Sequence, residues 1–108
     1  NPQILDIGSN DGSFLKKVKK KYPKVLGVEP TNTARNAIKK GINTIKKSLN
    51  FKLAKKILNK YSKFDFIIAS NFFAQTNNLK EILKSIKLIL DKKGLLIVEV
   101  KFKTQWTK

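Results

Sequence analysis

The sequence predicts an α/β protein with a Rossmann-like, doubly wound parallel sheet and helices on both faces. Apolar runs of strand length alternate along the chain with amphipathic runs of helix length. The connections between these runs are short, so right-handed crossovers through the helices are expected to join successive strands. The first apolar run ends in a polar loop between Gly8 and Gly12, a pattern typical of a tight turn from a strand into a helix.

The chain opens with a strand, a helix and a second strand. Residues 3–7 form an apolar run that predicts a buried strand. Residues 13–22 carry apolar side chains at helical spacing, and Pro23 ends this helix. The apolar run over 24–28 predicts the second strand.

A second helix and a short third strand follow. Thr31 or Asn32 can serve as the N-cap of this helix, which extends through Lys40 and ends at Gly41. The third strand is expected within residues 43–49. The sequence up to this point repeats a strand-helix unit twice.

The second half of the chain continues the same alternation. Asn50 is the expected N-cap of a helix over 51–61. The nearly continuous apolar run over 64–70 is typical of a central parallel strand that is covered on both faces. A helix over 79–90 and a fifth strand over 95–100 complete the pattern.

The loop after the first strand has the chemistry of a nucleoside site. Gly8 permits a backbone conformation that a Cβ would oppose, and Gly12 permits close approach of backbone and ligand where the helix begins. The short polar side chains of Ser9, Asn10 and Asp11 can cap the helix, and its free amides favour a carboxylate or phosphate. Glu29, which ends the second apolar run, can accept hydrogen bonds from both hydroxyls of a ribose.

These residues resemble a known family. Asp6-Ile-Gly-Ser-Asn-Asp-Gly12 with Gly27-Val-Glu-Pro30 is similar to the first two motifs of class I S-adenosylmethionine (SAM)-dependent methyltransferases, with Asn10 in place of the middle glycine. The segment Asp65-Phe-Ile-Ile-Ala-Ser-Asn-Phe-Phe-Ala-Gln75 most resembles the subgroup of sugar C-methyltransferases. The resemblance implies SAM as the cofactor, the strand order 3-2-1-4-5, and a fold that lacks its last strands.

The resemblance also implies a set of cofactor-binding residues. Asp6 would orient the loop and the amino acid part of SAM, although it can also simply accept bonds from local amides. Ser48 would contact the adenine. Its match to the family rests only on its position after the third strand. Asn71 and Phe72 would lie beside the methionine part and the transferred methyl. The implied cofactor-binding residues are Asp6, Gly8, Ser9, Asn10, Asp11, Gly12, Glu29, Pro30, Ser48, Asn71 and Phe72.

No catalytic residue can be assigned from the sequence. Members of the resembled subgroup commonly have a histidine base where this chain has Gln75, and an amide has no useful basicity near neutral pH. SAM carries an activated methyl, so aligning an oxygen or nitrogen acceptor with it is sufficient for methyl transfer without a general base. Methylation of a carbon atom is disfavoured because it needs such a base. An inactive relative that binds the cofactor without transferring methyl stays open as an alternative.

Length and composition limit the number of domains and the kinds of site that this chain can have. The 108 residues make one domain, 1–108, which is short for a complete enzyme of this kind, so a piece of a longer chain is expected. The sequence has neither cysteine nor histidine, so disulfides are excluded and no metal site is expected. There is no apolar run of membrane-spanning length and no signal-peptide pattern, and we expect a cytoplasmic protein. Its oligomeric state is open.

The formal charge of +17 invites a nucleic-acid interpretation. Only Arg35 among the 24 basic residues is an arginine, however, and the lysines cluster where helices face water. We therefore favour a small-molecule acceptor such as a nucleotide-linked sugar over an RNA-directed or non-catalytic binding domain. A nicotinamide-dependent oxidoreductase is a further alternative, but the loop lacks the Gly-x-Gly-x-x-Gly spacing for a pyrophosphate.

Overall fold

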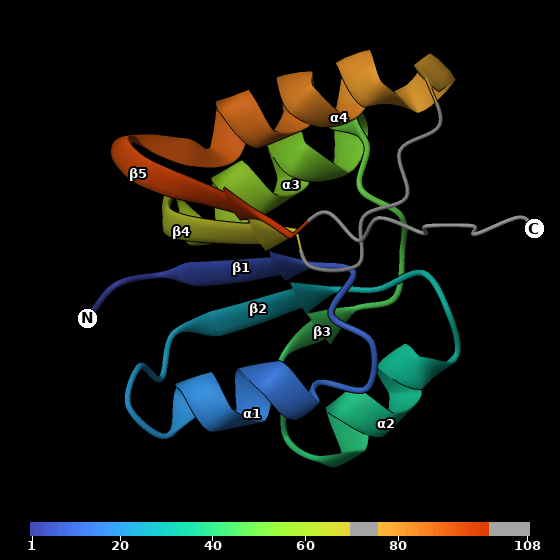
Figure 1. The fold of residues 1–108 in the computed structure, drawn as a ribbon, viewed down its shortest axis with the longest axis vertical. Coiled ribbons are helices and arrows are strands. Elements are labelled where there is room, and N and C mark those ends of the chain that lie inside the picture. Colours follow the sequence, from blue (N-terminus) through green and yellow to red (C-terminus); the bar gives the residue numbers. More distant parts are fainter. Residues whose placement is uncertain (70–75, 100–108) are drawn as a thin grey trace, which may run out of the picture.

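Five parallel strands form a single sheet in the order β3-β2-β1-β4-β5 (Figure 1). The structure, a computed structural model, describes residues 1–69 and 76–99. The predicted fold class and strand order are confirmed. In chain order the elements are β1 (Ile4–Ile7), α1 (Ser13–Lys19), β2 (Val25–Val28), α2 (Thr33–Lys39), β3 (Thr44–Ile45), α3 (Phe51–Tyr61), β4 (Phe64–Ala69), α4 (Thr76–Ile89) and β5 (Leu90–Val98).

The helices form two layers on the sheet. Figure 1 shows α1 and α2 on one face and α3 and α4 on the other. Because side chains alternate along a strand, β1 sends Leu5 and Ile7 into the core under α3 and α4, and Ile4 into a second core with Leu15 and Ala37. All residues of β1 and β2 are buried, as expected for central strands covered on both faces.

Helix ends differ in places from the sequence-based expectations. The first helix ends at Lys19 instead of residue 22, and the amides of Lys21 and Tyr22 donate to the carbonyl of Val18 in a turn. Pro23 accounts for this, because the residue before a proline disfavours helical backbone. The cap of α3 is as predicted: Asn50 Oδ1 accepts a hydrogen bond of 2.8 Å from the Leu53 amide.

The fifth strand begins earlier than predicted. Leu90 pairs with Phe64, the chain then makes an irregular turn, and the strand resumes with Leu95 beside Phe66. Asp91 Oδ1 accepts a hydrogen bond from the Lys93 amide within this turn. The strand predicted over 95–100 therefore corresponds to the regular part of β5, as far as the described residues extend.

Gly12 and Gly41 provide a matched test of the packing. Both have left-handed backbone, with φ of 77° and 84°, but a Cβ on Gly12 would lie 2.8 Å from the Ala37 Cβ, whereas one on Gly41 would meet nothing within 4 Å. Gly12→Ala is expected to lower the free energy of unfolding by about 2 to 4 kcal/mol, from backbone strain plus overpacking. Gly41→Ala should lose only about 1 kcal/mol, from strain alone. Urea unfolding measures both, and equal losses would contradict the packing argument.

Candidate functional site

The carboxyl ends of the central strands meet at one edge of the sheet. Ile7 is in register with Val28 on one side and with Ala69 on the other. Ala69 is in turn paired with Val98. The winding direction reverses between β1 and β4, and in open α/β sheets ligands bind beyond the carboxyl ends of the strands at such a reversal. The residues that follow β1, β2 and β5 therefore make up the candidate site.

The loop after β1 uses left-handed backbone three times. Gly8, Asn10 and Gly12 have φ values of 79°, 53° and 77°. Asparagine is one of the few residues with a side chain that adopt this conformation readily. This explains physically how Asn10 can stand where the resembled motif has a glycine. The amide of Gly8 donates a 2.8 Å hydrogen bond to the Val28 carbonyl, which ties the start of the loop to β2.

Glu29 holds this loop in place. It is only 4% exposed, and its Oε1 accepts a 2.8 Å hydrogen bond from the Asn10 amide. Its Oε2 accepts hydrogen bonds from the amide and the hydroxyl of Thr31, at 3.0 and 2.7 Å. Burial raises the pKa of the Glu29 carboxyl, but these hydrogen bonds outweigh it and leave the pKa below its ordinary value. The site thus contains a buried, ionised carboxylate.

The same hydrogen bonds change the expected start of the second helix. The Thr31 hydroxyl donates to Glu29, and Asn32, at the N-cap position of α2, makes no side-chain hydrogen bond to the helix. The prediction that Thr31 or Asn32 caps this helix with its side chain is therefore wrong. The carboxylate of Glu29 is the stronger acceptor for the Thr31 hydroxyl, because hydrogen bonds to an ionised group are stronger than those to a neutral one.

Asp11 occupies the start of α1. Its Oδ1 accepts a 3.0 Å hydrogen bond from the Ser13 amide, and its Oδ2 lies 3.2 Å from the Lys40 ammonium. Hydrogen bonds from Ser13, followed by that from Lys40, lower the pKa of Asp11 to about 2. The helix start therefore already has an anion of its own chain. The N-cap position itself is Gly12, so Asp11 acts from one residue earlier than a standard cap.

The hydroxyl of Ser9 faces inward. It is buried and has no hydrogen-bond partner within residues 1–69 and 76–99, and a Cβ on Gly27 would lie 2.5 Å from it. The expectation that the Ser9 side chain can cap the first helix is therefore wrong. Gly27 is required here because any larger residue on β2 would collide with this serine.

A cleft of about 520 Å³ lies above this loop. Its floor is a row of three residues in register on neighbouring strands, Asp6, Ile68 and Ile97. Five lining residues were not predicted as site residues: Ser13 and Phe14 of α1, and Ile68, Ile97 and Glu99. For the last three, the sequence does not show which residues of adjacent strands lie side by side. The residues that line the cleft are Asp6, Gly8, Ser9, Asn10, Asp11, Ser13, Phe14, Ile68, Ile97 and Glu99.

The other predicted site residues lie outside the lining of this cleft. Glu29 contacts it through the Asn10 amide, and Pro30 follows Glu29 as an exposed residue. The missing Cβ of Gly12 makes room for Ala37 of α2. Ser48 lines a separate hollow of about 320 Å³ with Lys47, Asn50, Lys52, Leu53 and Lys56. Asn71, Phe72 and Gln75 lie outside the described residues.

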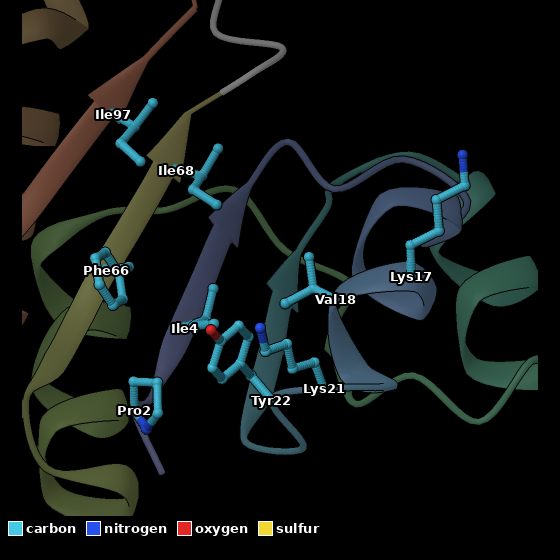
Figure 2. A pocket seen from close by; sticks show the side chains of 9 residues that line it. All are labelled: Pro2, Ile4, Lys17, Val18, Lys21, Tyr22, Phe66, Ile68 and Ile97. Carbon is cyan, nitrogen blue, oxygen red and sulfur yellow. The ribbon is translucent and has the colours of Figure 1, made fainter.

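An apolar groove of about 710 Å³ adjoins the cleft along the sheet (Figure 2). It shares Ile68 and Ile97 with the cleft. Phe66 and Ile97 on its floor are 37% and 44% exposed, so no element of the described residues covers this part of β4 and β5. Figure 2 shows Val18, Tyr22 and two lysines of the α1 region beside it; the full lining is Pro2, Ile4, Lys17, Val18, Lys21, Tyr22, Phe66, Ile68 and Ile97.

The described residues contain neither a cluster of metal ligands nor a helix that could span a membrane. Residues 1–69 and 76–99 contain no group of three or more histidine, cysteine, aspartate or glutamate side chains that could hold a metal ion. No helix in these ranges has both the length and the apolar character to cross a membrane.

Known proteins resemble this chain over most of its length. It is 26% identical over 106 residues to the C-methyltransferase NovU of Streptomyces niveus, a match that covers 97% of this chain and 25% of NovU. A SAM-dependent methyltransferase from Archaeoglobus fulgidus has a similar structure, with a TM-score of 0.71, 22% identity, and coverage of 88% of this chain and 42% of that one.

A further similar structure contains the cofactor. SAM-bound CalS10, an amino pentose methyltransferase from Micromonospora echinaspora, gives a TM-score of 0.73 at 18% identity, over 94% of this chain and 43% of its own. The chain thus spans about a quarter of the curated relative and about two-fifths of these solved structures.

The sequence profile of one family, described as a methyltransferase domain, matches residues 1–107. This match covers nearly the whole chain. The strand order of the sheet agrees with the methyltransferase fold that the sequence predicted. The chain belongs to the methyltransferase domain family.

Proposed function

We propose that this domain binds SAM in the cleft after β1 and positions its methyl group for transfer to a small-molecule acceptor. The observation that carries the proposal is the hydrogen bond between the Asn10 amide and Glu29 Oε1. It joins the glycine loop to an ionised carboxylate at the switch point of the sheet, so the contacts needed by an amino acid group and by a ribose form one rigid unit.

The residues present fit the adenosyl part of the cofactor. A carboxylate has about four acceptor positions, and three of those on Glu29 are used by Asn10 and Thr31. The remaining position, on Oε1, would accept a ribose hydroxyl. Pro30 would bound the ribose, and Ser48, beyond β3, would face the adenine. These three residues all belong to the set that the sequence predicted.

The loop and the cleft fit the amino acid part. Asp6, Gly8, Ser9, Asn10 and Asp11 all line the 520 Å³ cleft. Ile68 and Ile97 on its floor suit the methylene groups of the aminobutyryl chain, while the backbone of the loop suits its charged end. The motif resemblance supports Asn71 and Phe72, which follow β4 in the sequence, as contacts of the transferred methyl group.

The bound cofactor would supply an activated methyl on a sulfonium, and the domain's task is to align the acceptor with it. We propose a nucleotide-linked sugar as the acceptor. Support comes from the motif resemblance to sugar C-methyltransferases and from the similarity to NovU and CalS10. Gln75 gives no base, so an oxygen or nitrogen acceptor is favoured over carbon.

We further propose that residues 1–108 are one domain of a longer protein whose other parts recognise the acceptor. The described residues contain the cofactor cleft but leave one face of β4 and β5 open, and the relatives are several times longer. The lysines of the described helices are spread over α1, α2, α3 and α4, which favours solvated surfaces over a dedicated RNA site.

Asp11 argues against a nicotinamide dinucleotide. Its carboxylate already takes the Ser13 amide at the start of α1, where a pyrophosphate would have to bind. A second negative group at this point would be repelled. The zwitterionic amino acid end of SAM carries no net charge and avoids this cost.

Calorimetric titration of the protein with S-adenosylhomocysteine and with NADH tests the cofactor. We expect micromolar binding of S-adenosylhomocysteine and no detectable binding of NADH. Tighter binding of NADH would contradict the proposed function.

Substitution of Glu29 tests the ribose contact. Glu29→Gln is expected to weaken S-adenosylhomocysteine binding about tenfold and to lower the free energy of unfolding by about 2 kcal/mol, because it removes charge-assisted hydrogen bonds. Thr31→Val is the matched control: it removes one hydrogen bond to Oε2 and should cost about 1 kcal/mol of stability with affinity unchanged. Equal affinities of Glu29→Gln and wild type would disprove the ribose contact.

The pH dependence of stability tests the charge on Glu29. The pKa of this carboxyl is lowered in the folded protein, so its contribution to stability is complete above its ordinary value of 4.5. This contribution is lost as the pH falls through the folded-state pKa. The difference in unfolding free energy between wild type and Glu29→Gln should therefore be largest at neutral pH and shrink in acid. A constant difference from pH 7 to pH 3 would refute the ionised state.

A further inference from the structure

Glu99 is placed on the wall of the cofactor cleft by the register of the sheet. Its amide donates a 3.2 Å hydrogen bond to the carbonyl of Ala69, so it directly follows the paired ends of β4 and β5. It lies two residues after Ile97, and side chains two apart on a strand share a face. Ile97 is on the floor of the cleft, and Glu99 is an exposed residue of the lining.

Glu99 also stands opposite the glycine loop. Ile7, Ala69 and Val98 lie side by side at the ends of β1, β4 and β5, and the next residues on the two outer strands of this set are Gly8 and Glu99. Neighbouring strands are about 4.8 Å apart, so the two backbones are separated by roughly 10 Å. Gly8 and Glu99 therefore border the cleft from strands on either side of β4.

The other carboxylates of this basic chain, including Asp6 and Asp11 in the lining of the same cleft, are buried or hydrogen-bonded by the chain itself. The sequence has 7 acidic and 24 basic residues. Hydrogen bonds from the chain's own amides engage five of the acidic side chains, and Asp6 is only 1% exposed. Among the described residues, Glu99 is the exposed carboxylate that accepts no hydrogen bond and lies in no ion pair. The five engaged residues are Asp11, Glu29, Asp65, Glu81 and Asp91.

An ammonium group bound in this cleft can pair with the carboxylate of Glu99. The aminobutyryl end of SAM carries an ammonium, which loses contacts with water in the cleft and needs hydrogen-bond acceptors there. An ammonium beside a carboxylate forms strong, charge-assisted hydrogen bonds. A partly enclosed cleft screens such a pair less than open solvent does.

We infer that the carboxylate of Glu99 binds the ammonium of the cofactor's amino acid group. This inference rests on the proposed function, since it places the same cofactor in the same cleft. In this arrangement Glu29 and Glu99 hold the two ends of the cofactor, one at the ribose and one at the ammonium. The glycine loop between them supports the chain that joins the two groups.

Two ligands distinguish binding of the ammonium by Glu99 from a general effect of the substitution on the shape of the cleft. S-adenosylhomocysteine has the ammonium, whereas 5′-methylthioadenosine retains the adenosine and the thioether but lacks the aminobutyryl group. Calorimetry on the full-length protein measures both affinities for wild type, Glu99→Gln and Glu99→Lys. Glu81→Gln is the matched control, because it removes the same charge from an exposed site on α4.

Glu99→Gln is expected to weaken S-adenosylhomocysteine about tenfold and to leave 5′-methylthioadenosine within twofold of wild type. Glu99→Lys should weaken S-adenosylhomocysteine further, and Glu81→Gln should change neither affinity. An equal loss for both ligands, or no loss for either, would overturn the inference while the proposed function stands. Failure of wild type to bind both ligands would instead contradict the proposed function, and the inference with it.

Discussion

The site depends on one buried interaction, the hydrogen bond from the Asn10 amide to the Glu29 carboxylate. It connects the loop after β1 to the end of β2, so the left-handed turns of the loop are held from both sides. A charged group that is 4% exposed is costly unless its acceptor positions are filled, and Asn10 and Thr31 fill three of them. The position that remains free is the one a ligand hydroxyl can use. Stability and ligand recognition therefore draw on the same carboxylate.

The fold was predictable because its signals are local and periodic. Alternating apolar runs and helical spacing gave the element order, and the resemblance of two motifs gave the strand order, which the structure confirms. The Asn50 cap was predictable from the same kind of local signal. The side chain of Thr31 was not predicted correctly, because its hydroxyl bonds the Glu29 carboxylate two residues earlier instead of an amide of the helix. The early end of α1 reflects Pro23, whose effect reaches back into the preceding turn.

The site was only partly predictable. Glycines and acidic residues near strand ends identified the loop and Glu29, but the cleft floor arises from the register between β1, β4 and β5. Pairing across strands is a property of the folded sheet. A signal for Glu99 was nevertheless present, because Val98-Glu99 repeats the Val28-Glu29 pattern of an acidic residue directly after an apolar strand. The groove beside the cleft could not be predicted either. Phe66 and Ile97 look like core residues in the sequence, yet they are partly exposed among the described residues.

Within this account, a strongly basic chain concentrates its few functional carboxylates at one edge of the sheet. The most direct test is a crystal structure of the protein with S-adenosylhomocysteine. The account predicts a ribose hydroxyl within hydrogen-bond distance of Glu29 Oε1 while the Asn10 amide still donates to the same carboxylate. A ligand bound away from the edge formed by β1, β2 and β4, with Glu29 contacting only its own chain, would contradict it.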